Sequence, residues 1–171
     1  AQRDFSRYFL NSFFISTVIT LGNLAICSMA GYALAKYRFW GRQFLFLAVL
    51  STLMLPLQVT MIPLFLVIKE FQWQNTYLGI IIPFLANPFG VFLMRQYILD
   101  VPDDLIEAAR IDGMHEFGIF IKIIMPLVKP ALMALAIFIF REAWQLYIWP
   151  LIIITSEKLR PLTVGLALFM S

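Results

Sequence analysis

The chain has 171 residues, of which 61% are hydrophobic and only 13% are charged, and its mean hydropathy is +0.85. An ordinary soluble domain carries about a quarter charged residues and could not bury this many apolar side chains at this length, so the composition excludes that class and indicates a protein of the lipid bilayer. The net charge is +3, but the cations are scattered between apolar runs rather than gathered on one face, which argues against a nucleic-acid partner.

Four apolar stretches are each long enough to cross the hydrocarbon core, which takes about 20 mostly apolar residues as a helix. Lipid offers the backbone no hydrogen-bonding partner, so each stretch is expected to be helical. The predicted fold class is therefore an all-α integral membrane protein, a polytopic helical bundle that forms one transmembrane domain over residues 1–171. The four predicted spans cover residues 13–35, 44–68, 78–98 and 127–154.

Small residues and prolines indicate how the first three spans pack. The first span has a small-residue face where another helix can approach closely, and Cys27, the only cysteine, is expected to pack within the span. Pro56 and Pro63 interrupt the second span. Pro83 and Pro88 interrupt the third, and each proline removes a helical hydrogen bond. Such kinks favour helices that line a cavity, although prolines are also common in membrane helices generally. The small residues are Gly22, Ala25, Ser28, Ala30 and Gly31.

The distribution of cations predicts the topology. Seven lie around two connections, the one between the first and second spans and the one between the third and fourth, whereas five lie on the other side. By the positive-inside rule the two connections are cytoplasmic and both chain ends lie outside the cell, so a further helix is expected to precede this segment. The seven are Lys36, Arg38, Arg42, Arg95, Arg110, Lys122 and Lys129, and the five are Arg3, Arg7, Lys69, Lys158 and Arg160.

The connection over residues 100–122 is too polar to span the membrane, and its opening has the chemistry of a helix start. Asp100 is a capping residue and Pro102 suits the first helical position. Asp103 and Asp104 place negative charge at the positive end of the helix dipole. Gly113 is a natural stop, so the sequence predicts a cytoplasmic helix of about three turns.

One face of this predicted helix is slim and is flanked by charges. Such a face can enter a groove on a partner protein, but a surface helix lying at the headgroup boundary would have the same periodicity. Helical spacing alone leaves both interpretations open. The face comprises Leu105, Ala108, Ala109 and Asp112, with Glu107 and Arg110 beside it.

The same segment resembles a known family. Glu107-Ala108-Ala109 is followed three residues later by Gly113, nine residues after that by Ile123, and then by Met125-Pro126. This pattern resembles the signature loop of ATP-binding-cassette (ABC) import permeases of the MetI-like type, in which leucine is usual in place of Met125. In that family the loop forms a coupling helix, which inserts into a groove of a cytoplasmic ATPase and transmits its closure to the membrane helices. The resemblance assigns ATPase coupling to Glu107, Ala108, Ala109, Arg110, Asp112, Gly113 and Pro126.

The resemblance extends over nearly the whole chain and is closest to the sugar-importing, maltose-permease-like branch. It implies a permease subunit that forms half of the translocation pathway for a sugar or related solute, with an ABC importer for a non-sugar solute as an alternative. In place of the Trp-Asn-Glu or Trp-Asn-Asp of that branch the chain has Trp144-Gln145-Leu146, and its acidic residue is displaced to Glu142. Matching features are Asn11-Ser12, Ala33-Leu34-Ala35-Lys36, Phe39-Trp40-Gly41-Arg42, Pro56 with Gln58, Ile62-Pro63, Asn75-Thr76, Trp149-Pro150-Leu151 and Leu162-Thr163-Val164-Gly165-Leu166.

Partners and location also follow from the resemblance. It implies a cytoplasmic ATPase dimer, which binds ATP and Mg, a second homologous permease subunit and an extracytoplasmic solute-binding protein. It places the chain in the cell inner membrane as a multi-pass protein, with the coupling loop in the cytoplasm and one further helix at each end of the full protein. The sequence has no P-loop and no catalytic motif of an intramembrane enzyme, so we expect a transport subunit without its own ATPase site or cofactor. His115 has no second ligand cluster, so no metal site is predicted and a surface or interface position is expected.

Polar residues in the fourth span are the candidates for the translocation pathway. Arg141 and Glu142 are ionisable at membrane depth, where charges are costly and usually functional. Adjacent positions on a helix point about 100° apart, so each is expected to pair with another helix rather than with its neighbour. A proton-coupled secondary transporter that uses this pair is the alternative from a different class. Trp144, Gln145 and Tyr147 suit a sugar by stacking and hydrogen bonding, or else belong to packing and an interfacial aromatic belt.

Overall fold

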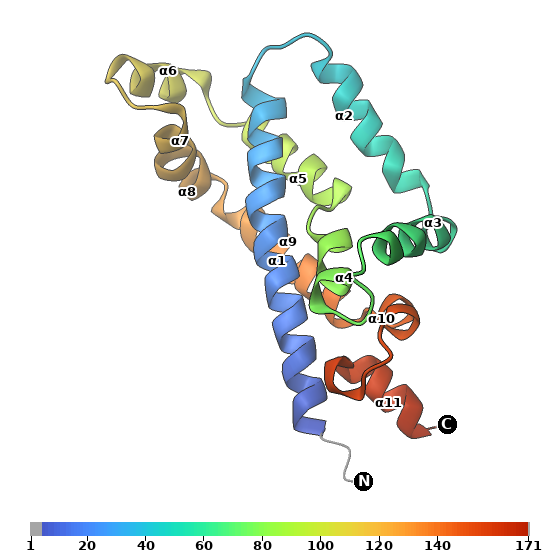
Figure 1. Ribbon diagram of the computed structural model, residues 1–171. Helices are drawn as coiled ribbons and strands as arrows, with labels where there is room; N and C mark the ends of the chain where they lie inside the picture. The colour runs from blue at the N-terminus through green and yellow to red at the C-terminus, as the bar shows by residue number, and fades with distance from the viewer. Residues whose placement is uncertain (1–4, 171) are drawn as a thin grey trace. The chain divides into compact units, whose positions relative to one another are not determined.

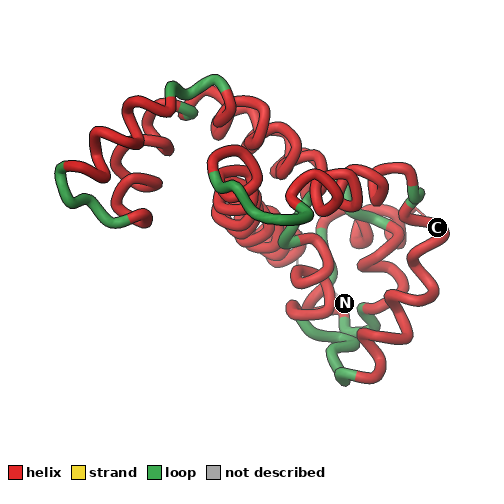
Figure 2. Tube along the Cα trace, turned by 90° about the horizontal axis from the view of Figure 1, so that it is seen from above, coloured by secondary structure: helices red, strands yellow, loops and turns green. Residues whose placement is uncertain are grey.

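The computed structural model describes residues 5–170, and every regular element in this range is helical (Figures 1 and 2). The predicted all-α fold is therefore confirmed. Arg3, one of the cations in the predicted topology, lies outside the described residues. The helices are α1 (Phe5–Lys36), α2 (Arg42–Ser51), η1 (Thr52–Met54), α3 (Leu57–Glu70), α4 (Tyr77–Ile81), η2 (Ile82–Phe84), α5 (Pro88–Leu99), α6 (Asp103–Ile111), α7 (Glu116–Ile119), η3 (Phe120–Ile124), α8 (Met125–Leu127), α9 (Lys129–Trp144), α10 (Ile148–Ile153), η4 (Glu157–Leu159) and α11 (Leu162–Met170).

Only α1 is by itself long and apolar enough to cross a membrane within the described range, and three bent pairs of shorter helices would bring the number of spans to four. The four predicted spans remain a prediction. Many large apolar side chains are open on the surface, among them Phe44 (78% exposed), Ile62 (72%) and Ile137 (73%). Apolar surface of this kind is stable only against lipid or further helices.

The chain divides into two compact units, which we describe separately. Unit 1 comprises residues 1–22, 55–85 and 138–171. Unit 2 comprises residues 23–54 and 86–137.

In unit 1, polar side chains of α1 hold the segment around η4 through backbone groups. The Asn11 amide donates to the carbonyls of Lys158 (2.9 Å) and Arg160 (3.0 Å), and its oxygen accepts from the Tyr77 hydroxyl (2.8 Å). The Ser12 hydroxyl accepts from the backbone N–H of Leu162 at 2.8 Å. These contacts give a structural account of the Asn11-Ser12 pair that carried part of the family resemblance.

Asn75 organises the turn between α3 and α4 in the same unit. It adopts a left-handed conformation (φ 56°), which asparagine tolerates better than most residues. Its backbone N–H donates to the Ile153 carbonyl (2.9 Å), and its side-chain oxygen accepts from the N–H groups of Thr155 (3.2 Å) and Ser156 (2.8 Å). Its neighbour Thr76 caps α4 by accepting from the N–H of Gly79.

The predicted fourth span is not one helix, because α9 ends at Trp144 and α10 begins at Ile148. Pro150 has no N–H to donate to the carbonyl of Leu146, and its ring would clash with that carbonyl in a continuous helix. The Leu146 carbonyl instead accepts from the Thr163 hydroxyl at 2.6 Å. Trp149, just beyond the break, is 1% exposed and donates to the Gly79 carbonyl at 3.0 Å.

Prolines act as expected at three of four positions. Pro56 stands at the start of α3, Pro83 lies in the 3₁₀ turn η2, and Pro88 opens α5. The prediction for Pro63 is wrong in part, since α3 continues through it. There the chain loses one hydrogen bond, to the carbonyl of Val59, without losing the helix.

In unit 2, the C-terminal half of α1 packs closely on α5. A Cβ on Gly31 would lie 2.8 Å from the Cβ of Met94 and 2.9 Å from the backbone nitrogen of Arg95, so only glycine permits this approach. The side chain of Cys27 is fully buried, as expected of a small packing residue. Arg95 donates to the Leu34 carbonyl and its guanidinium stands 4.0 Å above the ring of Phe46.

Candidate functional site

Helix α6 forms the centre of the candidate coupling segment in unit 2. It has nine residues, about two and a half turns, and starts with Asp103 and Asp104 in its first turn. Gly113 follows with φ 79°, a conformation that favours glycine and ends the helix, as predicted. Two details of the prediction are wrong: Asp100 ends α5 rather than capping α6, and Pro102 stands one position earlier than expected, at the N-cap.

The exposed face of α6 differs from the predicted one by one residue. Ile106 (2% exposed) and Ala109 (5%) point inward and anchor the helix, so Ala109 is not available for docking as predicted. Their spacing of three residues places them on one side of the helix. Leu105 (44% exposed) and Ile111 (86%) remain open on the surface. Five of the residues that the resemblance assigned to ATPase coupling are exposed in and just after α6: Glu107, Ala108, Arg110, Asp112 and Gly113.

A first contact ties the start of α6 to the end of α1. The Lys36 ammonium group donates to the Val101 carbonyl (2.5 Å) and to Asp103 Oδ1 (2.6 Å). The Lys36 side chain is only 6% exposed, whereas that of Asp103 is 67% exposed. The hydrogen bond and charge of Lys36 lower the pKa of Asp103. The lysine expected from sequence to set topology therefore also has a specific structural partner.

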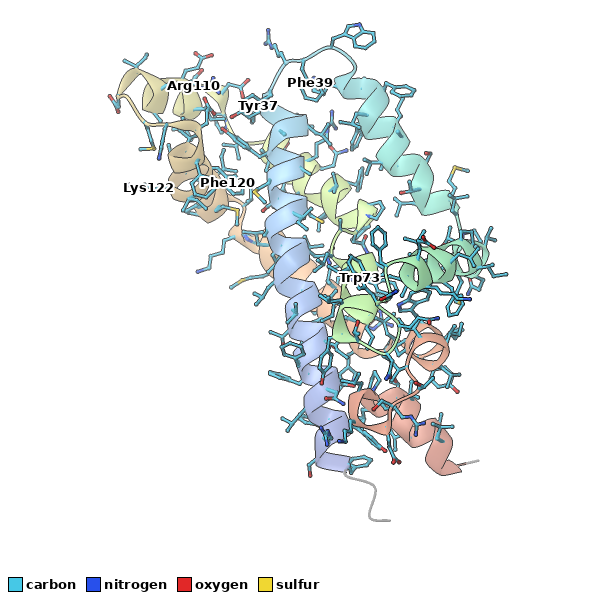
Figure 3. The ribbon with its side chains drawn as sticks, in the orientation of Figure 1. Tyr37, Phe39, Trp73, Arg110, Phe120 and Lys122 are labelled. Atoms are coloured by element: carbon cyan, nitrogen blue, oxygen red, sulfur yellow. The ribbon has the colours of Figure 1, made fainter. Side chains whose placement is uncertain are left out.

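A second contact ties the end of α6 to the same part of α1 through Glu116. Its Oε1 accepts from Arg110 Nε at 2.7 Å, and its Oε2 accepts from the hydroxyls of Tyr37 (2.6 Å) and Tyr32 (3.2 Å). We call these four residues the Glu116 cluster, and Figure 3 shows Arg110 on α6 and Tyr37 at the end of α1. Sequence reasoning missed it, because Glu116 lies 79 residues from Tyr37 and 84 from Tyr32.

Electrostatics keep the Glu116 cluster charged. Hydrogen bonds from Arg110 and then Tyr37 lower the pKa of Glu116 to about 2, although partial burial opposes the shift. The same contact raises the pKa of Arg110. Burial, followed by the hydrogen bond to Glu116, raises the pKa of Tyr37. At neutral pH the cluster is therefore a carboxylate held by one cation and two neutral hydroxyls.

The return segment from α7 to α8 fixes the position of Glu116. His115 caps α7, and its Nδ1 accepts from the Gly118 N–H at 3.1 Å, so the exposed histidine expected from sequence has a local structural role. A π-helical turn, η3, precedes Pro126, which cannot donate to the Lys122 carbonyl. Pro126 lies in α8 and is exposed; the chain leaves helical geometry two residues later, at Val128.

Unit 1 contains the candidate translocation groove. It is an open groove of ≈ 420 Å³ lined by Phe13, Phe140, Arg141, Trp144 and Gln145. Three of the five predicted pathway residues thus lie together, whereas Glu142 and Tyr147 are not among the residues that line it.

Aromatic rings from α1 and α9 form the apolar part of this groove. Phe13 meets Phe140 edge-on at 6.2 Å between ring centroids, and Phe140 stacks on Trp144 at 5.8 Å. Phe9 packs edge-on against Trp144 at 5.5 Å. The phenylalanines were not predicted as pathway residues, but their spacing is a usable signal. Phe9 and Phe13, and likewise Phe140 and Trp144, are four residues apart and share a helix face.

Arg141 and Glu142 contact each other, contrary to the expectation that each pairs with another helix. Arg141 Nη1 lies 3.4 Å from Glu142 Oε1, and the side chains are 63% and 52% exposed. An exposed pair of this kind is weak, so Arg141 can turn towards a ligand at little cost. In residues 5–170, no three His, Cys, Asp or Glu side chains come together as a metal site would require.

Comparisons with known proteins agree on the family. Residues 9–169 match the model of the family described as "Binding-protein-dependent transport system inner membrane component". The chain is 46% identical over 160 residues to the arabinooligosaccharides transport system permease protein AraQ of Halalkalibacterium halodurans, covering 94% of this chain and 57% of that protein. It is 38% identical over 162 residues to the sn-glycerol-3-phosphate transport system permease protein UgpE of Escherichia coli strain K12, covering 95% and 58%.

A solved structure has the same fold. A chain of a bacterial ABC transporter involved in the import of the acidic polysaccharide alginate superposes with a TM-score of 0.89 and 30% identity, covering 95% of this chain and 57% of that one. The chain spans a little over half the length of the relatives it matches. The fold and the family match over residues 9–169 together establish that this chain belongs to the family of inner membrane components of binding-protein-dependent transport systems.

Proposed function

We propose that the protein is a permease subunit of an ABC importer and forms half of the translocation pathway for a sugar or a related solute. A cytoplasmic ATPase dimer, which binds ATP and Mg, drives the cycle, and a second homologous permease completes the pathway. An extracytoplasmic solute-binding protein delivers the solute. Residues 100–122 face the cytoplasm in this proposal, and the chain itself carries out no chemistry.

The observation that carries the proposal is the exposed face of α6. Leu105, Ala108 and Ile111 offer apolar contact, and Glu107 and Arg110 provide charges that can fix register in a groove of the ATPase. The buried pair Ile106 and Ala109 holds the opposite face to the permease. A helix with one face anchored and the other open suits the transmission of a push from a bound partner.

The groove in unit 1 supports a carbohydrate-like solute. Phe140 and Trp144 offer ring faces for stacking, and Arg141 and Gln145 add hydrogen-bond donors at the groove. Named solutes of the relatives are arabinooligosaccharides, sn-glycerol-3-phosphate and alginate. The last two are anionic, and an arginine that is free to turn into the groove suits such a solute as well as a neutral sugar.

Reconstitution of the full-length protein tests the proposal. The permease, its paired permease, the ATPase and the binding protein would be placed in liposomes, with radiolabelled arabinooligosaccharide and glycerol 3-phosphate as probes. We expect solute uptake to require ATP on the side of the membrane where the ATPase lies. A protonophore should leave the uptake unchanged. Uptake that persists without ATP and collapses with the protonophore would instead support proton coupling through Arg141 and Glu142.

A further inference from the structure

Helix α6 has no short covalent path to α1, yet two sets of side chains join them within unit 2. Lys36 and Asp103 lie 67 residues apart in sequence, and Tyr37 and Glu116 lie 79 apart. The chain itself connects the coupling segment to α5 and α9, the two helices that a push on α6 would be expected to move first. The contacts to α1 provide a separate route.

We propose that Glu116 is a positioning residue that locks the coupling helix α6 to the C-terminal end of α1, so that α1 moves together with α6 during the transport cycle. This inference rests on the proposed function, because it assigns a role within ATPase coupling. It adds the first span to the helices that the ATPase drives directly.

The geometry of Glu116 suits a clamp rather than a chance surface contact. Both carboxylate oxygens are used: one binds α6 through Arg110, and the other binds the end of α1 through Tyr37 and Tyr32. Tyr32 is 5% exposed and packs against Tyr37 and Phe120, with ring centroids 5.5 Å and 5.6 Å away. One end of the clamp is therefore set in the core, and the other reaches the exposed helix.

Helix α6 is attached to the end of α1 at both of its ends. Lys36 holds the first turn of α6 by bonding Asp103, whereas Glu116 holds Arg110 in its last turn. Two contacts at opposite ends of a short helix resist rotation as well as translation relative to α1. A single contact would leave α6 free to pivot.

The fold depends only weakly on this clamp. The side chains of Arg110 and Glu116 are 43% and 44% exposed, and surface ion pairs contribute little to folding. Ile106 and Ala109 remain to anchor α6 when the pair is removed. Loss of the clamp should therefore loosen transmission without unfolding the protein.

The first test replaces Glu116 in the reconstituted transporter and measures solute imported per ATP hydrolysed. We expect Glu116→Ala to lower this ratio about fivefold or more while ATP hydrolysis continues. A fivefold change is the low end of a typical coupling effect between two sites. Glu116→Gln, which keeps the size and one acceptor, should fall between Glu116→Ala and the wild type. Asp100→Ala removes an exposed acid at the end of α5, outside both the cluster and the docking face of α6, and should leave the ratio unchanged.

A cross-link distinguishes a lock from a merely structural contact. Tyr37→Cys and Glu116→Cys would be combined in a background without other accessible thiols, since Cys27, the only native cysteine, is buried. The double variant should have the low ratio, and joining the two thiols with a short bifunctional reagent should restore it towards the wild-type ratio. A cross-linked transporter that hydrolyses ATP but imports nothing would mean that α6 must move against α1, which overturns the proposal.

The outcomes separate this inference from the proposed function. If the wild-type complex shows no ATP-driven uptake, the proposed function fails. If the wild type is coupled and Glu116→Ala is equally well coupled, the lock alone is wrong.

Discussion

Polar side chains in unit 1 mostly bond to backbone groups, whereas those holding the coupling segment in unit 2 join charged side chains to one another. Asn11, Asn75 and Trp149 each reach a carbonyl or N–H of a distant segment in unit 1. In unit 2 the corresponding contacts are Lys36–Asp103 and Arg110–Glu116. The Trp149 hydrogen bond is buried, whereas both side chains of the Arg110–Glu116 pair are more than 40% exposed. Losing a partner in a buried hydrogen bond costs more than losing one in an exposed ion pair. We therefore expect the fold of unit 1 to depend more on Trp149 than the fold of unit 2 depends on the Arg110–Glu116 pair.

The largest effect should come from Trp149 in unit 1. Trp149→Ala removes a fully buried side chain and leaves the Gly79 carbonyl without its donor, so we expect a loss of about 3–5 kcal/mol in the free energy of unfolding. Chemical unfolding of the purified protein in detergent measures this loss. Trp149→Phe, which keeps a ring but loses the donor, should cost less. Equal stability of wild type and Trp149→Ala would break the comparison between the units.

A smaller loss is expected at Asn75. Asn75→Ala removes the acceptor for two N–H groups and places alanine at φ 56°, and the two costs together amount to about 2 kcal/mol. Asn75→Gly keeps the backbone conformation and removes only the hydrogen bonds, so about half of the loss should remain. If both variants have the same free energy of unfolding as the wild type, the Asn75 side chain does not hold the turn.

In unit 2, Glu107→Lys should change function without changing stability. Glu107 is exposed on α6, so charge reversal leaves the fold intact but disturbs docking on the ATPase, and we expect import to fall about tenfold, which corresponds to ~1.4 kcal/mol. Membrane abundance and unfolding are the matched readouts, and Glu107→Gln is the milder control. If the Glu107→Lys variant imports solute at the normal rate, Glu107 does not belong to the surface that docks on the ATPase.

The smallest effect is the pH dependence of the Glu116 cluster. The pKa of Glu116 is lowered from 4.5 to about 2, so its contribution to stability is fully present above pH 4.5 and is lost as the pH falls through about 2. The difference in thermal stability between wild type and Glu116→Gln should therefore stay constant from pH 8 to pH 5. A difference that disappears already near pH 6 would show that Arg110 and Tyr37 do not hold the carboxylate as described.

Much of the fold and the coupling segment could be predicted from local sequence. Apolar runs of sufficient length require helices in lipid, and Gly113 ends α6 where its φ of 79° would strain another residue. The break after Trp144 was missed, although Pro150 is a local signal for it. Periodicity also could not decide which side of α6 is buried, since Ala108 and Ala109 are equally small and only packing turned Ala109 inward.

By itself, the sequence determined three things: composition indicated a lipid environment, the length of the apolar runs indicated helices, and the spacing from Glu107 to Pro126 indicated the family. Each of these can be read without knowing how distant segments pack. Only the tertiary structure decided that Glu116 joins Arg110 to two tyrosines and that Phe13 and Phe140 complete a groove with Trp144. These groups lie in segments that are far apart in the chain. Their meeting depends on how helices pack, which no local pattern encodes.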